Sequence, residues 1–112
     1  MLSNIYTAVL DNDAVTYLQA DCADFETAAI ILSGTWDGEI LPYVTLGELN
    51  YPIVGIQDAQ TGTITSSINA NDAPVESQYF ANVRGLTGFG VYCNAWTSGS
   101  VTVQISLHRA SK

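Results

Sequence analysis

The residues of this chain that could do chemistry are one histidine, two cysteines and several carboxylates. A hydrolase or transferase needs a nucleophile beside a base, a pair of carboxylates or a bound metal. His108 lies on the polar phase of one alternating stretch, whereas Cys93 lies on the apolar phase of another. Because successive side chains of a strand point to opposite faces, these two residues are not expected to form a dyad. We expect His108 to be an ordinary surface residue near the end of the chain.

The acidic residues that could be considered as calcium ligands are Asp11, Asp13, Asp21 and Asp24. Calcium needs several oxygens that converge on one point, commonly from a loop with alternating acidic positions. The run Asp11-Asn12-Asp13 is too short for such a loop and lacks its downstream glycine and glutamate. We therefore expect these residues to form turns, and we predict no metal, no cofactor and no enzymatic activity.

The two cysteines are far apart in the sequence and do not have the spacing of metal ligands. Cys93 is expected to be a small buried hydrophobic residue, and Cys22 is expected near the end of a strand or in a loop. A disulfide between them stays open as an alternative. A single pair without an export signal favours two thiols.

The chain is strongly acidic, with eleven Asp and Glu against three Lys and Arg, and a net charge of −8. It has no Lys or Arg before Arg84, so it lacks the cations that neutralise the phosphates of a nucleic acid or an anionic membrane. The N-terminus has neither the basic start nor the apolar run of a signal peptide, and no export is expected. We predict a soluble protein that binds neither nucleic acid nor membrane.

The candidate residues described above are expected to lie on or beside short strands in which apolar and polar residues alternate. Apolar residues alternate from Phe89 to Ala95 and again from Val101 to Leu107, and Thr97-Ser98-Gly99 between them predicts the turn of a hairpin. No stretch has helical periodicity with caps, beyond one possible turn after Asp24. The sequence predicts a single domain over 1–112, an all-β antiparallel sandwich of jelly-roll or Greek-key type with little or no helix. Strands are expected over 5–10, 13–20, 27–34, 38–46, 52–58, 62–69, 76–84, 88–96 and 100–109.

Turn residues are expected between several of these strands. Asp11-Asn12-Asp13 predicts a tight hairpin between the first two strands. The run from Gly34 to Gly38 predicts a turn between the third and the fourth.

Aromatic and apolar residues on outward phases are the best candidates for a contact surface. Ile31 is apolar where its strand should face outward, and Tyr92 and Trp96 share the non-core phase of theirs. Aromatic rings bury a large area at little entropic cost, so they stack on sugars or anchor protein interfaces. They could equally cover a second layer of the fold. The candidate interface residues are Ile31, Trp36, Tyr43, Tyr92 and Trp96, with Tyr51 as a further aromatic.

An ordered set of motifs resembles a small all-β module of tailed-bacteriophage virion structural proteins. The apolar strand from Ala28 runs into Gly34-Thr35-Trp36-Asp37-Gly38, and a Tyr-to-Gly-Leu segment spans 79–86. An aromatic-Thr-Ser-Gly motif follows at 96–99, and a Val-Thr-Val strand ends the set at 101–107. The resemblance covers 28–109. The outward positions Gly90, Tyr92 and Asn94 lack the arginines that the module often carries there.

The resemblance implies a structural role in the virion, assembled in the host cytoplasm, and no catalysis. We expect a capsid decoration (cement) protein that binds the major capsid protein, or another virion protein, on the outer surface of the head. A homo-oligomer, trimer or dimer, is the expected state. The alternative is a tail, baseplate or fibre module that binds a host-surface glycan through Trp36, Tyr92 and Trp96.

Overall fold

The fold is all-β, as the sequence predicts. A computed structural model describes residues 2–11, 16–47, 49–52, 55–69 and 76–109, and no helix occurs in these ranges. All strand pairs are antiparallel. The strands are β1 (Leu2–Leu10), β2 (Tyr17–Asp21), β3 (Thr27–Leu46), β4 (Leu49–Pro52), β5 (Ile56–Asp58), β6 (Ile64–Thr65), β7 (Ile68–Asn69), β8 (Glu76–Asn82) and β9 (Gly88–Arg109).

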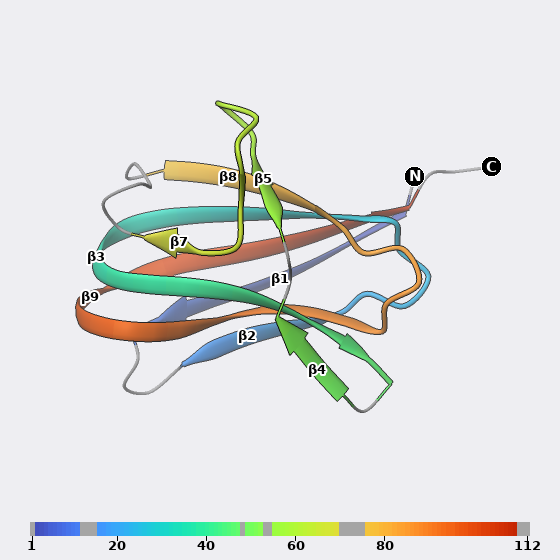
Figure 1. Cartoon of the computed structure of the whole chain (residues 1–112), viewed down its shortest axis with the longest axis horizontal. Helices are drawn as coiled ribbons and strands as arrows, with labels where there is room; N and C mark the ends of the chain where they lie inside the picture. The colour runs from blue at the N-terminus through green and yellow to red at the C-terminus, as the bar shows by residue number, and fades with distance from the viewer. Residues whose placement is uncertain (1, 12–15, 48, 53–54, 70–75, 110–112) are drawn as a thin grey trace.

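Two very long strands, β3 and β9, organise the molecule. They pair with each other along almost their whole length and fold back together, at the left of Figure 1. The fold-back produces two layers, each holding one half of either strand. In the first, called here the β8 layer, the order is β1-β9-β3-β8-β5-β6. In the second, the β2 layer, β2 pairs with β9, while β4 and β7 pair with β3.

The predicted hairpin at Thr97-Ser98-Gly99 is wrong, and so is the predicted turn between Gly34 and Gly38. Both segments lie inside continuous strands, β9 and β3, at the fold-back. Trp36 is paired with Gly99, and Asp37 with Ser98, so the ladder runs through the bend. Glycine permits a turn and also permits a strand to bend, and the sequence signal for the two is the same.

A bulge makes the bend possible. Asp37 pairs with Ser98 and Glu39 pairs with Asn94, so Gly38 alone faces the three residues 95–97 of β9. Within this bulge Ala95 has a φ of 48°, in the left-handed region. A bulge adds length to one strand and bends it, which takes β9 around the outside of β3.

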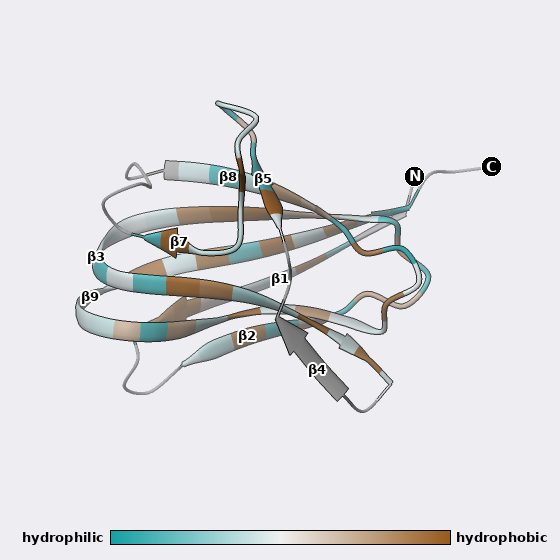
Figure 2. Ribbon diagram, viewed as in Figure 1, coloured by the Kyte–Doolittle hydropathy of each residue, from teal (hydrophilic) through white to brown (hydrophobic). Residues whose placement is uncertain are grey.

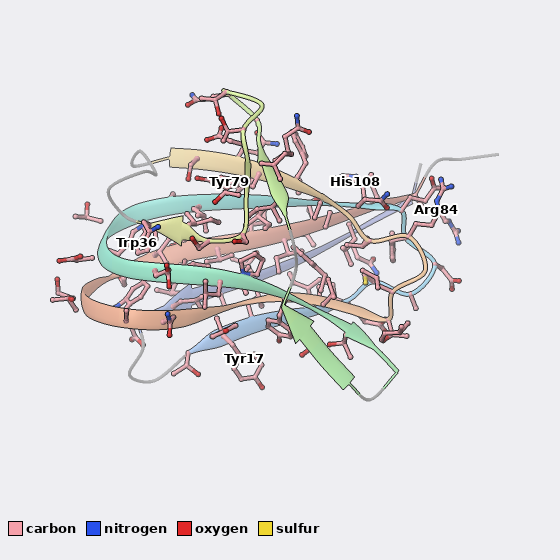
Figure 3. All side chains as sticks on the ribbon, viewed as in Figure 1. Tyr17, Trp36, Tyr79, Arg84 and His108 are labelled. Carbon is pink, nitrogen blue, oxygen red and sulfur yellow. The ribbon has the colours of Figure 1, made fainter. Side chains whose placement is uncertain are left out.

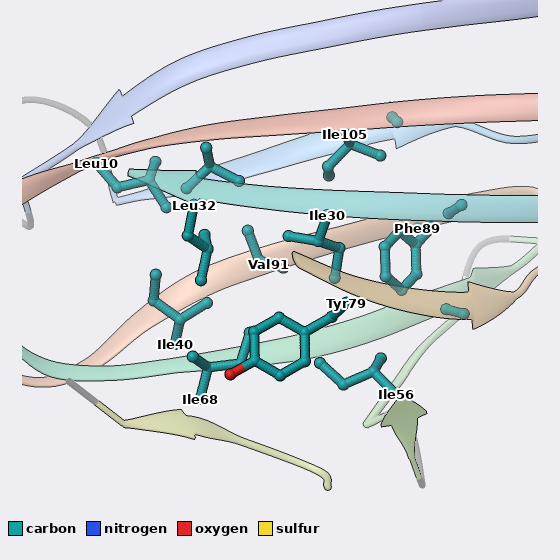
Figure 4. Packing of buried hydrophobic residues seen from close by; sticks show 14 of the residues in the cluster. Leu10, Ile30, Leu32, Ile40, Ile56, Ile68, Tyr79, Phe89, Val91 and Ile105 are labelled. Carbon is teal, nitrogen blue, oxygen red and sulfur yellow. The ribbon is translucent and has the colours of Figure 1, made fainter. Parts of the chain in front are cut away.

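The core lies between the two layers. The β8 layer contributes Ile30, Leu32 and Ile105, and the β2 layer contributes Ile40 and Phe89, all fully buried. Figure 4 shows these side chains packed together with Tyr79. Figure 2 shows the matching alternation of hydrophobic and hydrophilic residues along the long strands. Cys22 and Trp36 also belong to this core, and Cys93 packs against it.

Other predicted details differ from the structure. The first two strands form no hairpin, because β1 and β2 pair with different halves of β9. Part of the predicted 13–20 strand lies outside the described residues, and the predicted 52–58 and 62–69 strands are short separate pieces. The turn after Cys22 is a β-turn, closed by a hydrogen bond from Phe25 N to Cys22 O of 3.0 Å, with Asp24 at a φ of 71°.

Candidate functional site

The residues that could do chemistry are not assembled into a catalytic site in the described part of the chain. His108 is half-buried near one end of β9 (Figure 3), and its Nε2 lies 3.1 Å from Ser106 Oγ. A serine–histidine pair needs a third group to orient the imidazole, but His108 Nδ1 has no hydrogen-bond partner among the described atoms. His108 and Cys93 lie in different layers and do not meet, as predicted.

The acidic residues and the cysteines of the described ranges form no cluster. Within the described ranges, no group of three His, Cys, Asp or Glu residues is arranged to hold a metal ion. Asp21 instead accepts a hydrogen bond from Ala23 N at 3.1 Å and so fixes a turn, while Asp13 lies outside the described residues. Cys22 and Cys93 are not joined by a disulfide. No helix in the described part of the chain is long and apolar enough to cross a bilayer.

The first candidate surface is the outer face of the β8 layer. Its large apolar side chains are well exposed: Ile5 62%, Val9 50%, Ile31 37% and Phe80 42%. They come from β1, β3 and β8, which the second half of β9 joins into one sheet. None of the side chains named next is charged, and we call this surface the uncharged face. Its residues are Ile5, Thr7, Val9, Ala29, Ile31, Ser33, Gln78, Phe80, Thr102, Gln104 and Ser106. The Glu26–Arg84 ion pair borders it, where both residues line a pocket with Phe80.

One cross-strand row of the uncharged face has small residues at its centre. Ile5, Ser106, Ala29 and Phe80 form this row, with the two small residues between the two large ones. Ser106 and Ala29 are buried although they point outward. A sheet face with small residues between large apolar ones can pack against protruding side chains of a partner, which an evenly polar face cannot.

The second candidate surface is the outer face of the β2 layer, where three tyrosines gather. Tyr17 is paired with Tyr92 across β2 and β9, and Tyr43 lies on the neighbouring strand β3. The Tyr43 and Tyr92 rings are 5.9 Å apart and tilted by 59°. Tyr17 is 58% exposed and Tyr92 is 39% exposed. We call Tyr17, Tyr43 and Tyr92 the tyrosine face.

Two glycines of β9 shape the tyrosine face. A Cβ atom on Gly90 would lie 2.6 Å from the Tyr43 ring, so only glycine lets this ring lie flat on the strand. The Tyr43 hydroxyl donates a hydrogen bond to Gln19 Oε1 at 2.7 Å. Burial, and secondarily the nearby Tyr17 hydroxyl, raise the pKa of Tyr43. Beside this bridge, a groove of about 700 Å³ runs over Gly88, with Asp21 among its lining residues.

The two tryptophans belong to neither face. Trp36 is only 9% exposed and belongs to the core, which corrects its expected place on a contact surface. Trp96 is half-buried and stacks on Trp36 at the fold-back. The predicted shared phase of Tyr92 and Trp96 is wrong, because the left-handed Ala95 shifts the alternation between them. For the same reason Ala95 is exposed and not in the core.

Comparison with known proteins places the fold. No protein-family model matches the chain, and no curated protein sequence matches it. Among solved structures, the SPBc2 prophage-derived protein YomS superimposes with a TM-score of 0.72 at 11% identity, over 96% of each chain. This chain has the YomS fold.

A second solved structure agrees. The PBSX exported protein XepA matches with a TM-score of 0.74 at 12% identity, over 96% of this chain. The match covers 38% of XepA, so this chain spans well under half of that protein's length. At such identities the likeness concerns the fold, and any function must be argued from the residues of this chain.

The predicted site residues are thus divided among three places. Ile31 lies on the uncharged face, Tyr43 and Tyr92 lie on the tyrosine face, and Trp36 and Trp96 close the fold-back. The side chain of Tyr51 is outside the described residues. Sequence reasoning missed Ile5, Val9 and Tyr17. The alternation within β1 and β2 could have placed them on the outer face, because Leu10 and Ala20 occupy the opposite, buried positions.

Proposed function

We propose that this protein is a non-catalytic structural protein of a tailed-bacteriophage particle, and that the uncharged face binds a neighbouring virion subunit. The observation that carries the proposal is this face itself. In a protein of net charge −8, it combines four exposed apolar side chains with polar neutral ones and no described charge. The YomS fold and the motifs at 34–38 and 96–99 support a phage origin.

The size of the uncharged face fits a docking surface. Four strands about 4.8 Å apart and seven residues of about 3.3 Å each give a face of roughly 400 Å². The largest apolar patch of a soluble protein has about this size and is often functional. Covering the four half-exposed side chains contributes roughly 1 kcal/mol each, enough to hold a subunit that is bound in many copies.

Within the particle, we propose the outer surface of the head, where the protein acts as a capsid decoration protein. A small acidic domain with one uncharged face can lie flat on the shell and direct its charged surfaces to solvent. By bridging neighbouring copies of the major capsid protein, it would stabilise the shell against internal pressure.

Adding the purified protein to heads of its phage that lack it tests this proposal. We expect co-sedimentation of the wild type with the heads and a higher unfolding temperature of the shell. Ile31→Lys should abolish both effects, whereas Leu46→Lys should not, because Leu46 is also exposed, at 53%, but lies at the end of β3 in the β2 layer. Heads that bind no wild-type protein would contradict the decoration role.

A second candidate function is a tail, baseplate or fibre module that binds a host-surface glycan, and the tyrosine face favours it. Sugar rings present flat C–H surfaces that pack on aromatic rings, while hydroxyls bond to amides and carboxylates nearby. Tyr17 and Tyr92 offer exposed rings, and Gln19 and Asp21 line the adjacent groove. The net negative charge favours a neutral glycan.

A glycan array separates this candidate from the first. Binding of a neutral glycan by the wild type, lost in Tyr92→Ala and kept in Ile31→Lys, would support the tail module. Tyr92 is a better residue to change than Trp96, because Trp96 stacks on Trp36 and its removal would also disturb the fold-back. If no glycan binds, or if Tyr92→Ala binds equally well, this candidate is excluded.

A further inference from the structure

The strand β1 is an edge strand without the usual protection. It pairs with β9 over all nine residues with no shift in register, and no described segment pairs with its other side. Natural edge strands are blunted by lysine, proline, a bulge or shortness. The β1 sequence Leu-Ser-Asn-Ile-Tyr-Thr-Ala-Val-Leu has no charged residue and no proline. The opposite edge of the same layer, β6, has only two residues.

An unprotected edge offers a row of backbone N–H and C=O groups to another strand. The edge of β1 also borders the uncharged face, because Ile5, Thr7 and Val9 point outward from it. A strand added here would therefore extend both the hydrogen-bonded sheet and the apolar surface. Such strand addition is a common way for one chain to bind another.

The distribution of charge favours a second copy of this chain as the partner that pairs with the free edge of β1. Two molecules of net charge −8 repel each other over most of their surfaces. At β1 this repulsion is weak, since neither the strand nor the named side chains of the uncharged face carry charge. A C2 contact places the same patch on both subunits, so an uncharged strand meets an identical uncharged strand.

We propose that two copies pair through β1, antiparallel, and form one continuous sheet from their two β8 layers. Full overlap of Leu2–Leu10 with itself centres the two-fold axis on Tyr6. In this register Ile5 of one copy faces Thr7 of the second copy, and both side chains stay on the same side of the sheet. The two uncharged faces then become one.

The doubled face has the size of a standard binding surface. One uncharged face measures roughly 400 Å², about half of the ~800 Å² that one partner contributes to a typical stable interface. Two faces joined at β1 reach that value. The pairing of two copies stands independently, and only the docking of the doubled face on a virion subunit rests on the proposed function.

The first test is the oligomeric state of the full chain. Sedimentation equilibrium should show a monomer–dimer equilibrium for the wild type. Ile5→Lys and Val9→Lys should raise the dimer dissociation constant at least tenfold. Ile64→Lys is the matched control, because Ile64 is equally exposed, at 64%, but lies on the far strand of the same layer. It should leave the dissociation constant unchanged.

Cross-linking tests the register and does not depend on how the lysine variants fold. In a Cys93→Ser background, Ile5→Cys mixed with Thr7→Cys should form an intermolecular disulfide faster than either variant alone. Directly opposed residues bring Cα atoms to about 5 Å, within the range of a disulfide. Cys22 stays in place, because it is fully buried.

A wild type that remains monomeric at all concentrations would overturn the proposal. So would a dimer that Ile5→Lys and Ile64→Lys weaken equally, or mixed cysteine variants that cross-link no faster than Ile64→Cys. A wild type that stays monomeric and still binds heads would leave the decoration role intact and contradict only the dimer. A stable dimer that fails to bind heads would support the β1 pairing and contradict the decoration role.

Discussion

The indole rings of Trp36 and Trp96 stack with their centroids 5.2 Å apart and their planes within 10° of parallel. One ring comes from β3 and the other from β9, at the point where both strands fold back. Trp96 Nε1 also donates a hydrogen bond of 3.2 Å to Gly99 O. The pair therefore connects the bulge of β9 to the end of the core and determines how the two layers meet.

The first prediction concerns this pair. Trp36→Ala should lower the free energy of unfolding by about 3–5 kcal/mol, because it empties a buried site, and Trp96→Ala by about 2 kcal/mol, because that ring is half exposed. The double variant should lose about 1 kcal/mol less than the sum, which is the share of the stacking itself. Urea unfolding of the four proteins measures this coupling. Fully additive losses would show that the rings contribute only by burial.

The second prediction compares two glycines with similar backbone angles. Gly99 has a φ of 87° and Gly85 a φ of 84°, so alanine is strained at both, by about 1 kcal/mol. A Cβ on Gly99 would also collide with Thr35 O and lie 2.7 Å from Trp36 Cα, whereas nothing lies within 4 Å at Gly85. Gly99→Ala should cost about 2–4 kcal/mol and Gly85→Ala about 1 kcal/mol in thermal unfolding. Equal costs would mean that the bend tolerates a side chain.

The alternation of side chains predicted the strands and most of the core. Ile30, Leu32, Phe89 and Ile105 are buried because apolar residues at every second position need one common side. Alternation could not reveal the fold-back, because a bend inside a strand depends on the pairing of residues far apart in the sequence. That Gly38 faces three residues of β9 is a property of the pair of strands and not of either strand.

The candidate site was predicted only in part for the same reason. Tyr92 and the row from Thr102 to Ser106 look like one outward surface when β9 is considered as a hairpin. After the fold-back they lie on the outer faces of different layers. Ile31 was recognisable from its own strand, whereas Ile5 and Phe80 join the same face only because β1 pairs with β9 and β8 pairs with β3.

The third prediction concerns the two thiols. Cys22 is fully buried, and its Sγ lies 3.6 Å from Leu86 O, whereas Cys93 is half-buried. Burial, with a smaller contribution from Asp21, raises the pKa of Cys22, so little thiolate forms at neutral pH. A thiol reagent should modify Cys93 in the native protein and reach Cys22 roughly 100-fold more slowly, upon opening of the core. Simultaneous modification of both would contradict the burial of Cys22. Cys93→Ser provides the control, because it leaves only the slow phase.

The fourth prediction follows from Tyr43. Because its pKa is raised above the ordinary value of 10.0, the folded state holds its proton more tightly than the unfolded state does. The resulting stability is fully present below that value and is lost as the pH rises through the folded-state pKa. Tyr43→Phe should therefore flatten the decline of the unfolding free energy above pH 10.0. Part of the decline should remain, because Cys22 loses its proton in the unfolded state from its ordinary value of 9.0 upward.

Tyr17→Phe tests the two causes of the Tyr43 shift separately. It removes the second charge but leaves the burial of Tyr43, so it should recover a smaller part of the alkaline stability than Tyr43→Phe does. Absorbance at the tyrosinate band should follow the same order, with Tyr43 ionising at a lower pH in the Tyr17→Phe variant. If Tyr43→Phe and the wild type lose stability in parallel, then the Tyr43 ring on Gly90 is open to water, and the tyrosine face is less rigid than the Gln19 hydrogen bond implies.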